Sequence, residues 1–204
     1  MMLYLTNFPI VNSRLALGWL ANRYRVHQRL RMAYRDEPRL LFRIEEAGGT
    51  TRILAQSSTR PDWHDAFGEF NVLAAEPLVK ELNLDRLQKG GYYRFRLVAN
   101  PVITHDGKRK GLFKEEDQLN WIYRQLERSG AKVKECISRQ IGMERSEKNP
   151  AKDNQVQTHY AVEFNGVLLV EDAELLAERV RDGVGPAKAY GFGLISLAPF
   201  RIEA

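Results

Sequence analysis

Residues 183–193 are Gly-Val-Gly-Pro-Ala-Lys-Ala-Tyr-Gly-Phe-Gly, and the apolar run Leu-Ile-Ser-Leu-Ala-Pro follows at residues 194–199. Two Gly-x-Gly pairs therefore bracket five residues. Glycines spaced so closely indicate either a backbone with positive φ or a neighbour that approaches closer than a Cβ allows. Spacing alone leaves two interpretations open: a turn that leads into a buried strand, or a loop that faces a ligand.

The glycine run matches neither common phosphate-binding fingerprint. Gly-x-Gly-x-x-Gly requires glycine where Lys188 stands, and the Walker pattern requires Gly-Lys followed by Ser or Thr, which the chain lacks. We therefore expect no nucleotide cofactor.

Composition suggests a cytoplasmic protein of one large or two small domains. The chain has 204 residues, 44% of them apolar, and no apolar run near the roughly 20 residues that span a bilayer. The N-terminus lacks a secretory pattern, so we expect a cytoplasmic location and no membrane partner. Cys136 is the single cysteine, which excludes an internal disulfide and predicts a buried thiol.

Positive charge is concentrated at the start of the chain. The net charge is +5, and no acidic residue precedes Asp36. The arginines before it are Arg14, Arg23, Arg25, Arg29, Arg31 and Arg35. This pattern favours a localised site for a polyanion, and the alternative is a solvated arginine-rich helix face without a ligand.

The first half of the chain alternates strands and helices. Ser13 and Asn22 are expected N-caps, and Gly48-Gly49 lies in an expected hairpin connection. The expected elements are a strand at 2–6, helices at 13–20 and 22–35, strands at 39–45 and 51–57, a helix at 77–88 and a strand at 92–99.

The second half repeats this order. A basic loop at 104–111 precedes it, and Asn165-Gly166 is a two-residue turn signal inside the second of two long strands. The expected elements are a helix at 115–129, strands at 132–141 and 155–170 around a flexible tip at 142–154, a helix at 172–181, the glycine loop and a final strand.

This order predicts an α+β fold of two ferredoxin-like domains in tandem, which are RRM-like βαββαβ units with antiparallel sheets. The expected boundaries are an N-terminal domain at 1–102, a basic linker at 103–114 and a C-terminal domain at 115–204. Such sheets carry many readers of single-stranded RNA. The segment 92–96, Tyr-Tyr-Arg-Phe-Arg, is only superficially like their aromatic consensus.

Among the four histidines, only His27 has sequence neighbours suited to chemistry. It follows Tyr24 by three residues on the expected helix, so the imidazole and the phenol lie one turn apart. The surrounding cations are Arg23, Arg31 and Arg35. Imidazole, phenol and guanidinium groups are what metal-free RNA cleavage requires, because protons must move and phosphate charge must be stabilised. The alternative is a structural histidine.

Other chemistries have less support. No two histidines have metal-ligand spacing, and no carboxylate cluster indicates a two-metal nuclease. Ser196 lies in an apolar run without a Gly-x-Ser-x-Gly elbow. We expect neither a metal site nor a serine hydrolase.

Four segments of the chain also carry a family likeness. They are residues 24–30 (Tyr-Arg-Val-His-Gln-Arg-Leu), 93–101 (Tyr-Arg-Phe-Arg-Leu-Val-Ala-Asn-Pro), 118–122 (Gln-Leu-Asn-Trp-Ile) and, most specifically, 183–199. Together they resemble the CasE family, the CRISPR RNA endoribonucleases of the type I-E Cascade complex. One departure is Arg23, where some members have proline.

The resemblance implies two ferredoxin-like domains that bind the stem-loop of a CRISPR repeat in precursor RNA. It implies metal-independent cleavage at the base of the stem, which leaves a 2′,3′-cyclic phosphate and a 5′-hydroxyl. It further implies that the protein stays on the mature guide RNA as a Cascade subunit, beside other Cascade subunits, in antiviral defence. No cofactor is implied.

The resemblance places the family's catalytic histidine and tyrosine on His27 and Tyr24, and its RNA hairpin on the basic segment 139–152. Residues expected to bind RNA are Arg23, Arg31, Arg35, Lys108, Arg109, Lys110, Arg139, Gly183, Gly185, Lys188, Gly191 and Gly193. The basic loop has a second interpretation as a tether between domains. Two alternative functions stay open: a non-catalytic subunit that holds a processed guide RNA, and a ferredoxin-like protein without an RNA ligand.

Overall fold

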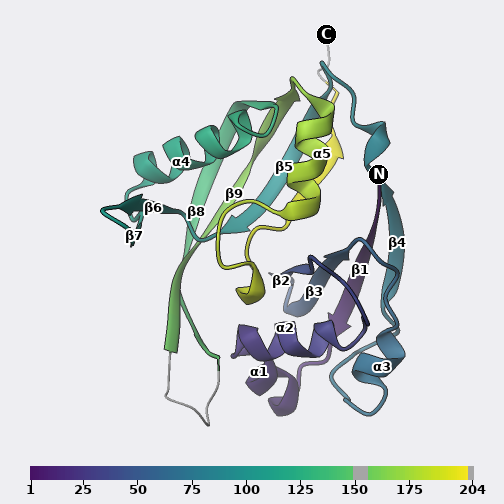
Figure 1. Cartoon of the computed structure of the whole chain (residues 1–204). Coiled ribbons are helices and arrows are strands. Elements are labelled where there is room, and N and C mark those ends of the chain that lie inside the picture. Colours follow the sequence, from purple (N-terminus) through teal and green to yellow (C-terminus); the bar gives the residue numbers. More distant parts are fainter. Residues whose placement is uncertain (149–155, 202–204) are drawn as a thin grey trace.

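The computed structural model describes residues 1–148 and 156–201 and contains two four-stranded antiparallel sheets (Figure 1). Helices cover one face of each sheet, and each sheet has its own buried core. No helix in the described part of the chain is long and apolar enough to cross a membrane.

The first sheet has the strand order β2-β3-β1-β4. Ser13 and Asn22 cap α1 and α2 as predicted: Ser13 Oγ accepts from the Ala16 N–H at 3.2 Å, and Asn22 Oδ1 accepts from the Tyr24 N–H at 3.2 Å. The elements are β1 (Met2–Ile10), α1 (Arg14–Leu20), α2 (Arg23–Arg31), β2 (Leu41–Ala47), β3 (Thr50–Ser57), α3 (Trp63–Phe67), β4 (Leu78–Asn83) and the 3₁₀ turn η1 (Leu84–Arg86).

The second sheet has the order β10-β5-β9-β8, which is the same topology. A small hairpin, β6 with β7, is inserted after the first strand of this unit. The elements are β5 (Tyr92–Ala99), β6 (Val102–His105), β7 (Lys108–Gly111), α4 (Glu115–Glu127), β8 (Ala131–Glu147), β9 (Val156–Val170), α5 (Ala173–Asp182), the 3₁₀ turn η2 (Lys188–Tyr190) and β10 (Ile195–Pro199). The prediction of tandem ferredoxin-like units is confirmed.

One expected element of the first half is wrong, and one correctly predicted strand belongs to the other sheet. The helix expected at 77–88 is the edge strand β4, which pairs with β1 from Leu78 opposite Asn7 to Asn83 opposite Met2. The strand 92–99 exists, but it is β5 and hydrogen-bonds β9 and β10 in the second sheet. Pairing with a distant strand decided both outcomes, and local periodicity does not contain that information.

The sheets therefore divide between β4 and β5, whereas the sequence placed the division at 102–115. As the domain boundary of the folded chain we propose the segment between Asn83 and Tyr92. The expected linker at 103–114 is occupied largely by the β6–β7 hairpin of the second unit.

The long β8–β9 pair also differs from expectation. Its strands continue to Glu147 and resume at Val156, and part of the expected tip, residues 149–155, lies outside the described residues. The predicted turn at Asn165-Gly166 is wrong, because β9 runs straight through it. A Cβ on Gly166 would lie 2.1 Å from the Glu135 carbonyl oxygen, at a bulge in β8. This glycine admits a close strand, and it does not mark a turn.

A buried arginine joins the two sheets. Arg43 on β2, whose side chain is 3% exposed, donates to Glu45 Oε1 on its own strand at 2.8 Å. Its other nitrogens donate to the Leu194 carbonyl and to Ser196 Oγ of the second unit, both at 2.9 Å. The guanidinium thus uses its donors both on the Glu45 carboxylate of its own strand and on acceptors of the second unit.

Removing this arginine tests its role. We expect Arg43→Ala to lower the free energy of unfolding by about 3–5 kcal/mol, because Glu45 and the Leu194 carbonyl lose a buried partner. Arg52→Ala is the matched control, since Arg52 pairs with the same Glu45 but is 48% exposed and should cost under about 1 kcal/mol. Urea denaturation measures both, and similar small losses would contradict the assignment.

Candidate functional site

Tyr24 and His27 lie on the first turns of α2 as a stacked pair. Their ring centroids are 6.2 Å apart with planes inclined by 24°, and both side chains are half-buried. The other face of the helix places Val26 and Leu30 in the first core. Phe42 of β2 supports His27 from beneath, with centroids 6.3 Å apart. The pair predicted from the three-residue spacing is therefore formed.

The imidazole of His27 favours its neutral form. Burial, aided by the positive charge of Arg31, lowers the pKa of His27 from 6.5 to about 4. In the protein alone at neutral pH, His27 is thus unprotonated and has a free lone pair that can accept a proton, whereas it is seldom available as an acid.

The start of α2 is held by the long β8 strand of the second unit. Arg23 forms a two-pronged ion pair with Glu144, at 2.7 and 3.0 Å, and Asn22 Nδ2 donates to the Glu147 carbonyl at 3.2 Å. Arg23 begins the helix and anchors it. Its charge is already neutralised by a carboxylate.

The glycine loop lies against α2. Tyr190 of η2 packs next to Tyr24, with ring centroids 5.8 Å apart. A Cβ on Gly191 would stand 3.2 Å from Nη1 of Arg23. Helix α2 and the loop belong to different units, so the site spans both.

The glycines of this loop accommodate the protein's own chain. Each has positive φ, and an added Cβ would meet protein atoms within 3.0 Å at every one of them. The neighbours are Leu41 for Gly183, Trp121 for Gly185, Phe42 for Gly191 and the Val184 carbonyl for Gly193. The close approach inferred from the sequence is real, and its cause is packing that fixes the loop in place.

Of the other cations predicted for the α2 site, only some lie next to it. Arg31 donates to the Glu37 carbonyl, and Lys188 is half-buried, with a pKa lowered by burial and by Arg39 and Arg179. Arg35 was expected on the helix, but α2 ends at Arg31 because the next N–H groups bond three residues back. Arg35 instead lines a surface hollow with Asp62.

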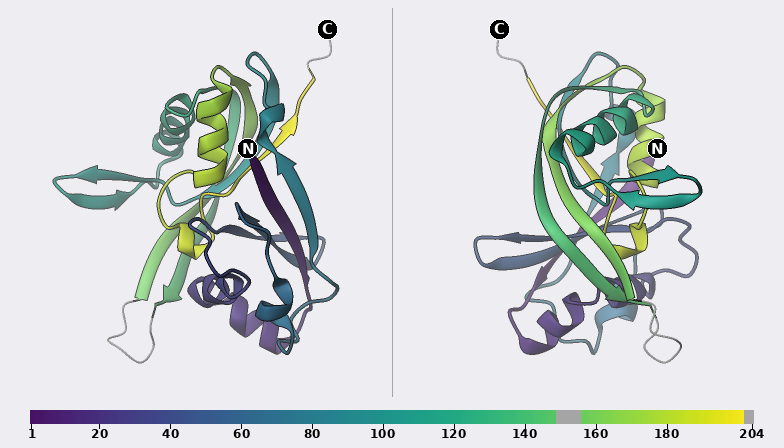
Figure 2. Two further views of the ribbon diagram at one scale, coloured as in Figure 1. Left: turned by 45° about the vertical axis from the view of Figure 1, so that its right-hand side comes forward. Right: turned by 90° about the vertical axis from the view of Figure 1, so that its left-hand side faces the viewer.

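The remaining predicted cations stand apart from His27. Lys108, Arg109 and Lys110 are exposed on the β6–β7 hairpin, which projects away from α2 (Figure 2). Arg139 on β8 is exposed and pairs with the buried Glu163 at 2.9 Å. The structure therefore separates a compact site around α2 from a peripheral basic surface.

Two residues that sequence reasoning did not single out join this site. The His159 ring on β9 lies 4.5 Å from the Tyr190 ring and 5.8 Å from Phe192. His27 is therefore not the only histidine that has aromatic neighbours in this site. Tyr190 lies inside the glycine run, so the sequence alone could have indicated it as a site residue. The position of His159 next to the site depends on how the two units pack together, which the sequence does not show.

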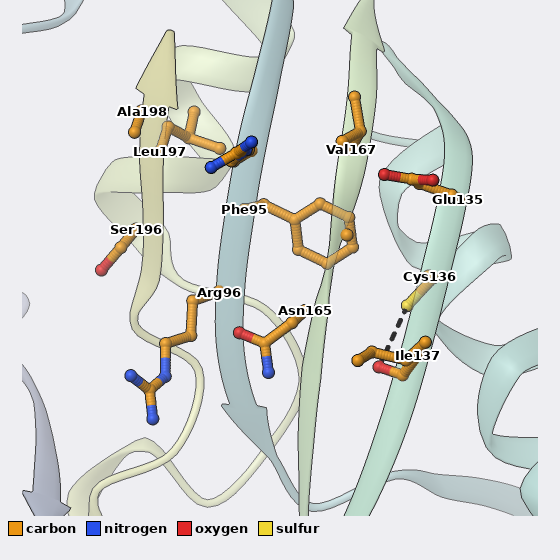
Figure 3. A pocket seen from close by; sticks show the side chains of 12 residues that line it. Phe95, Arg96, Glu135, Cys136, Ile137, Asn165, Val167, Ser196, Leu197 and Ala198 are labelled. Atoms are coloured by element: carbon orange, nitrogen blue, oxygen red, sulfur yellow. Dashed lines mark hydrogen bonds between the residues drawn. The ribbon is translucent and has the colours of Figure 1, made fainter. Parts of the chain in front are cut away.

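A hollow of about 590 Å³ lies on the second sheet (Figure 3). Its lining includes Arg94 and Arg96, from the segment that resembled an RNA-reading consensus. Phe95 is its one aromatic residue and is 3% exposed, as part of the core. The hollow thus lacks the exposed rings with which such sheets stack bases. Among the described residues, no group of three or more His, Cys, Asp or Glu is placed to hold a metal ion.

A family model described as CRISPR associated protein matches residues 3–199. The chain belongs to this family. Two curated family relatives extend over almost its whole length. The CRISPR-associated endoribonuclease Cse3 of Thermus thermophilus is 34% identical, covering 92% of this chain and 95% of the relative. The Cascade subunit CasE of Escherichia coli is 32% identical, covering 91% and 96%.

A solved structure of the family has the same fold. It is CRISPR endoribonuclease Cse3 bound to a 19-nucleotide RNA, with a TM-score of 0.84 and 33% identity. The match covers 96% of this chain and all of the other.

Two glycine-to-alanine substitutions, one inside the loop and one outside it, test whether close packing of the glycines holds the loop in place. Gly191 and Gly90 have almost the same φ, +81° and +82°, but only Gly191 has protein atoms within 4 Å of an added Cβ. Gly90→Ala should cost about 1–2 kcal/mol of unfolding free energy for the left-handed backbone. Gly191→Ala should cost about 1–3 kcal/mol more, because the methyl group presses on Phe42. Equal losses in urea denaturation would show that close packing at Gly191 is unimportant.

Proposed function

We propose that this protein is a metal-independent endoribonuclease that cuts the stem-loops of CRISPR repeats in precursor RNA and stays on the mature guide RNA as a Cascade subunit. The Tyr24–His27 pair, stacked at the junction of both units and facing the glycine loop, is the observation that carries the proposal. The RNA-bound endoribonuclease Cse3 and the Cascade subunit CasE support it as relatives over nearly the whole chain. The work would take place in the cytoplasm.

His27 is the proposed general base. Its neutral imidazole removes the proton of the 2′-hydroxyl, whose oxygen attacks the adjacent phosphate and displaces the 5′-oxygen of the next nucleotide. This reaction gives a 2′,3′-cyclic phosphate and a 5′-hydroxyl. Tyr24, one turn away, is proposed to orient the phosphate or to protonate the leaving oxygen.

The cations are proposed to have two separate tasks. Arg31 and Lys188 lie around α2 and the loop and stabilise the charge of the reacting phosphate, whereas Arg23, paired with Glu144, holds the start of α2. Lys108, Arg109, Lys110, Arg139 and Arg35 bind phosphates of the flanking RNA. The glycines at 183, 185, 191 and 193 act indirectly, by holding the loop against α2.

The first test is removal of the imidazole. His27→Ala should lower the single-turnover rate of repeat-RNA cleavage by about 10²- to 10⁴-fold, the usual contribution of general acid–base catalysis, while RNA affinity changes little. The assay is run in EDTA, and the products are checked for a cyclic phosphate. His64→Ala is the matched control, since His64 sits on α3, outside the site.

Each failure has its own meaning. Undiminished cleavage by His27→Ala removes His27 from the mechanism. Cleavage by the unaltered protein only after Mg²⁺ is added contradicts metal independence. Tight binding without any cut product identifies the protein as a non-catalytic guide-RNA subunit.

The pH dependence distinguishes base from acid. The profile of kcat/KM reports the free enzyme, in which the pKa of His27 is about 4. A base must be deprotonated. As the pH increases, kcat/KM should therefore increase up to about pH 4 and should then stay level between pH 5.5 and 7.5. If His27 is instead the acid, kcat/KM falls about tenfold for each pH unit across that range.

A further inference from the structure

Four aromatic rings form a row across the junction of the two units. The row begins at His159 on β9, passes through Tyr190 of the glycine loop to Tyr24 on α2, and ends at His27. Successive ring centroids are 4.5, 5.8 and 6.2 Å apart. We call these four residues the aromatic row. All four residues are half-buried.

The middle ring is held in a rigid loop. Tyr190 ends η2, whose flanking residues, Ala187 and Gly191, both have left-handed backbones with φ of +62° and +81°. A left-handed alanine is unfavourable, and such strain persists where surrounding contacts impose it, frequently at ligand sites. The packing of Gly191 against Phe42 supplies such a contact.

The outer ring has one hydrogen-bonding atom without a partner. Asn100 Oδ1 accepts from the Tyr160 N–H, so its Nδ2 donates to Nδ1 of His159 at 3.2 Å. Burial lowers the pKa of His159, and the neutral ring therefore carries its proton on Nε2. Nε2 is buried and has no hydrogen-bond partner among the described residues.

The phenol groups of the row are likewise uncommitted. No hydrogen bond joins the hydroxyl of Tyr24 or of Tyr190 to another described residue, although both rings are fixed by their neighbours. Tyrosine rings that are held in place, only half-buried and free of hydrogen bonds to other described residues match the needs of a stacking platform for a nucleobase. The hollow on the second sheet, by contrast, has Phe95 as its one aromatic lining residue, and Phe95 is buried in the core.

We propose that Tyr190, together with Tyr24, is a stacking subsite for the unpaired nucleobase that flanks the scissile phosphate. This inference rests on the proposed ribonuclease function. The row ends at His27, so a base stacked on Tyr190 and Tyr24 has its phosphate beside the His27 imidazole. Tyr190 is thus a specificity-determining residue for the unpaired nucleotide, and His159 supports its ring from the far side.

A cycle of protein and RNA changes tests this subsite. One RNA is the repeat stem-loop that the protein cleaves, with a 2′-deoxy sugar at the attacking nucleotide to prevent reaction. The second RNA is identical except that the flanking unpaired nucleotide is abasic. Kd values are measured for unaltered protein, Tyr190→Leu and Tyr190→Phe. Tyr123→Leu serves as the control, because Tyr123 is exposed on α4, away from the row.

Stacking on an aromatic side chain contributes about 1–3 kcal/mol per base, or about 5- to 150-fold in Kd. Tyr190→Leu should therefore weaken binding of the intact RNA by such a factor and leave the abasic RNA within twofold. Tyr190→Phe, which keeps the ring, should bind both RNAs as the unaltered protein does. Equal weakening of both RNAs, or none, would overturn the subsite.

A second measurement needs no variant and covers the case in which Tyr190→Leu does not fold. With 2-aminopurine at the flanking position, binding of unaltered protein should quench its fluorescence, because the base stacks. Unchanged or increased fluorescence contradicts stacking. If the unaltered protein does not cleave the unmodified repeat RNA, the proposed function fails as well. If it cleaves that RNA but Tyr190→Leu affects the intact and the abasic RNA equally, only the stacking subsite is ruled out.

Discussion

The buried Arg43 guanidinium is the contact on which the geometry of the site depends. It lies on β2 of the first unit and donates to the Leu194 carbonyl, just before β10 of the second unit, and to the Ser196 hydroxyl within β10. Burying a charge is costly unless every polar direction is paired, so the two units have one well-defined relative placement. Because α2 belongs to one unit and the glycine loop to the other, the site exists only in that placement.

Strand β2 extends this control along three consecutive residues. Leu41 lies against Gly183, Phe42 lies against both Gly191 and His27, and Arg43 bonds the Leu194 carbonyl. The same strand therefore seats both ends of the glycine loop and supports the imidazole. Glycine is required at the positions of the loop that lie closest to β2. This contact is a structural reason for the glycines of residues 183–193, the run most specific to the family. Its chemical residues, Lys188 and Tyr190, are positioned by that packing.

Local signals in the sequence predicted most elements correctly, because capping by Ser13 and Asn22 and the periodicity of α4 act over a few residues. They did not predict which sheet receives β5, since strand pairing is decided by distant partners. Treating β4 as a helix and β5 as its successor still gave the right fold class, because both errors preserved the βαββαβ order. Tyr24 and His27 were predictable as helix neighbours, whereas His159 meets Tyr190 only through the docking of the two units.

Cleavage is proposed to occur where α2 meets the glycine loop. The most direct measurement is an experimental structure of the protein with an uncleavable 2′-deoxy repeat RNA. The scissile phosphate is expected next to α2 and the loop, with the position of the attacking 2′-oxygen within about 3.2 Å of a His27 ring nitrogen. A scissile phosphate on the open face of the second sheet, beside Arg94 and Arg96, would contradict it.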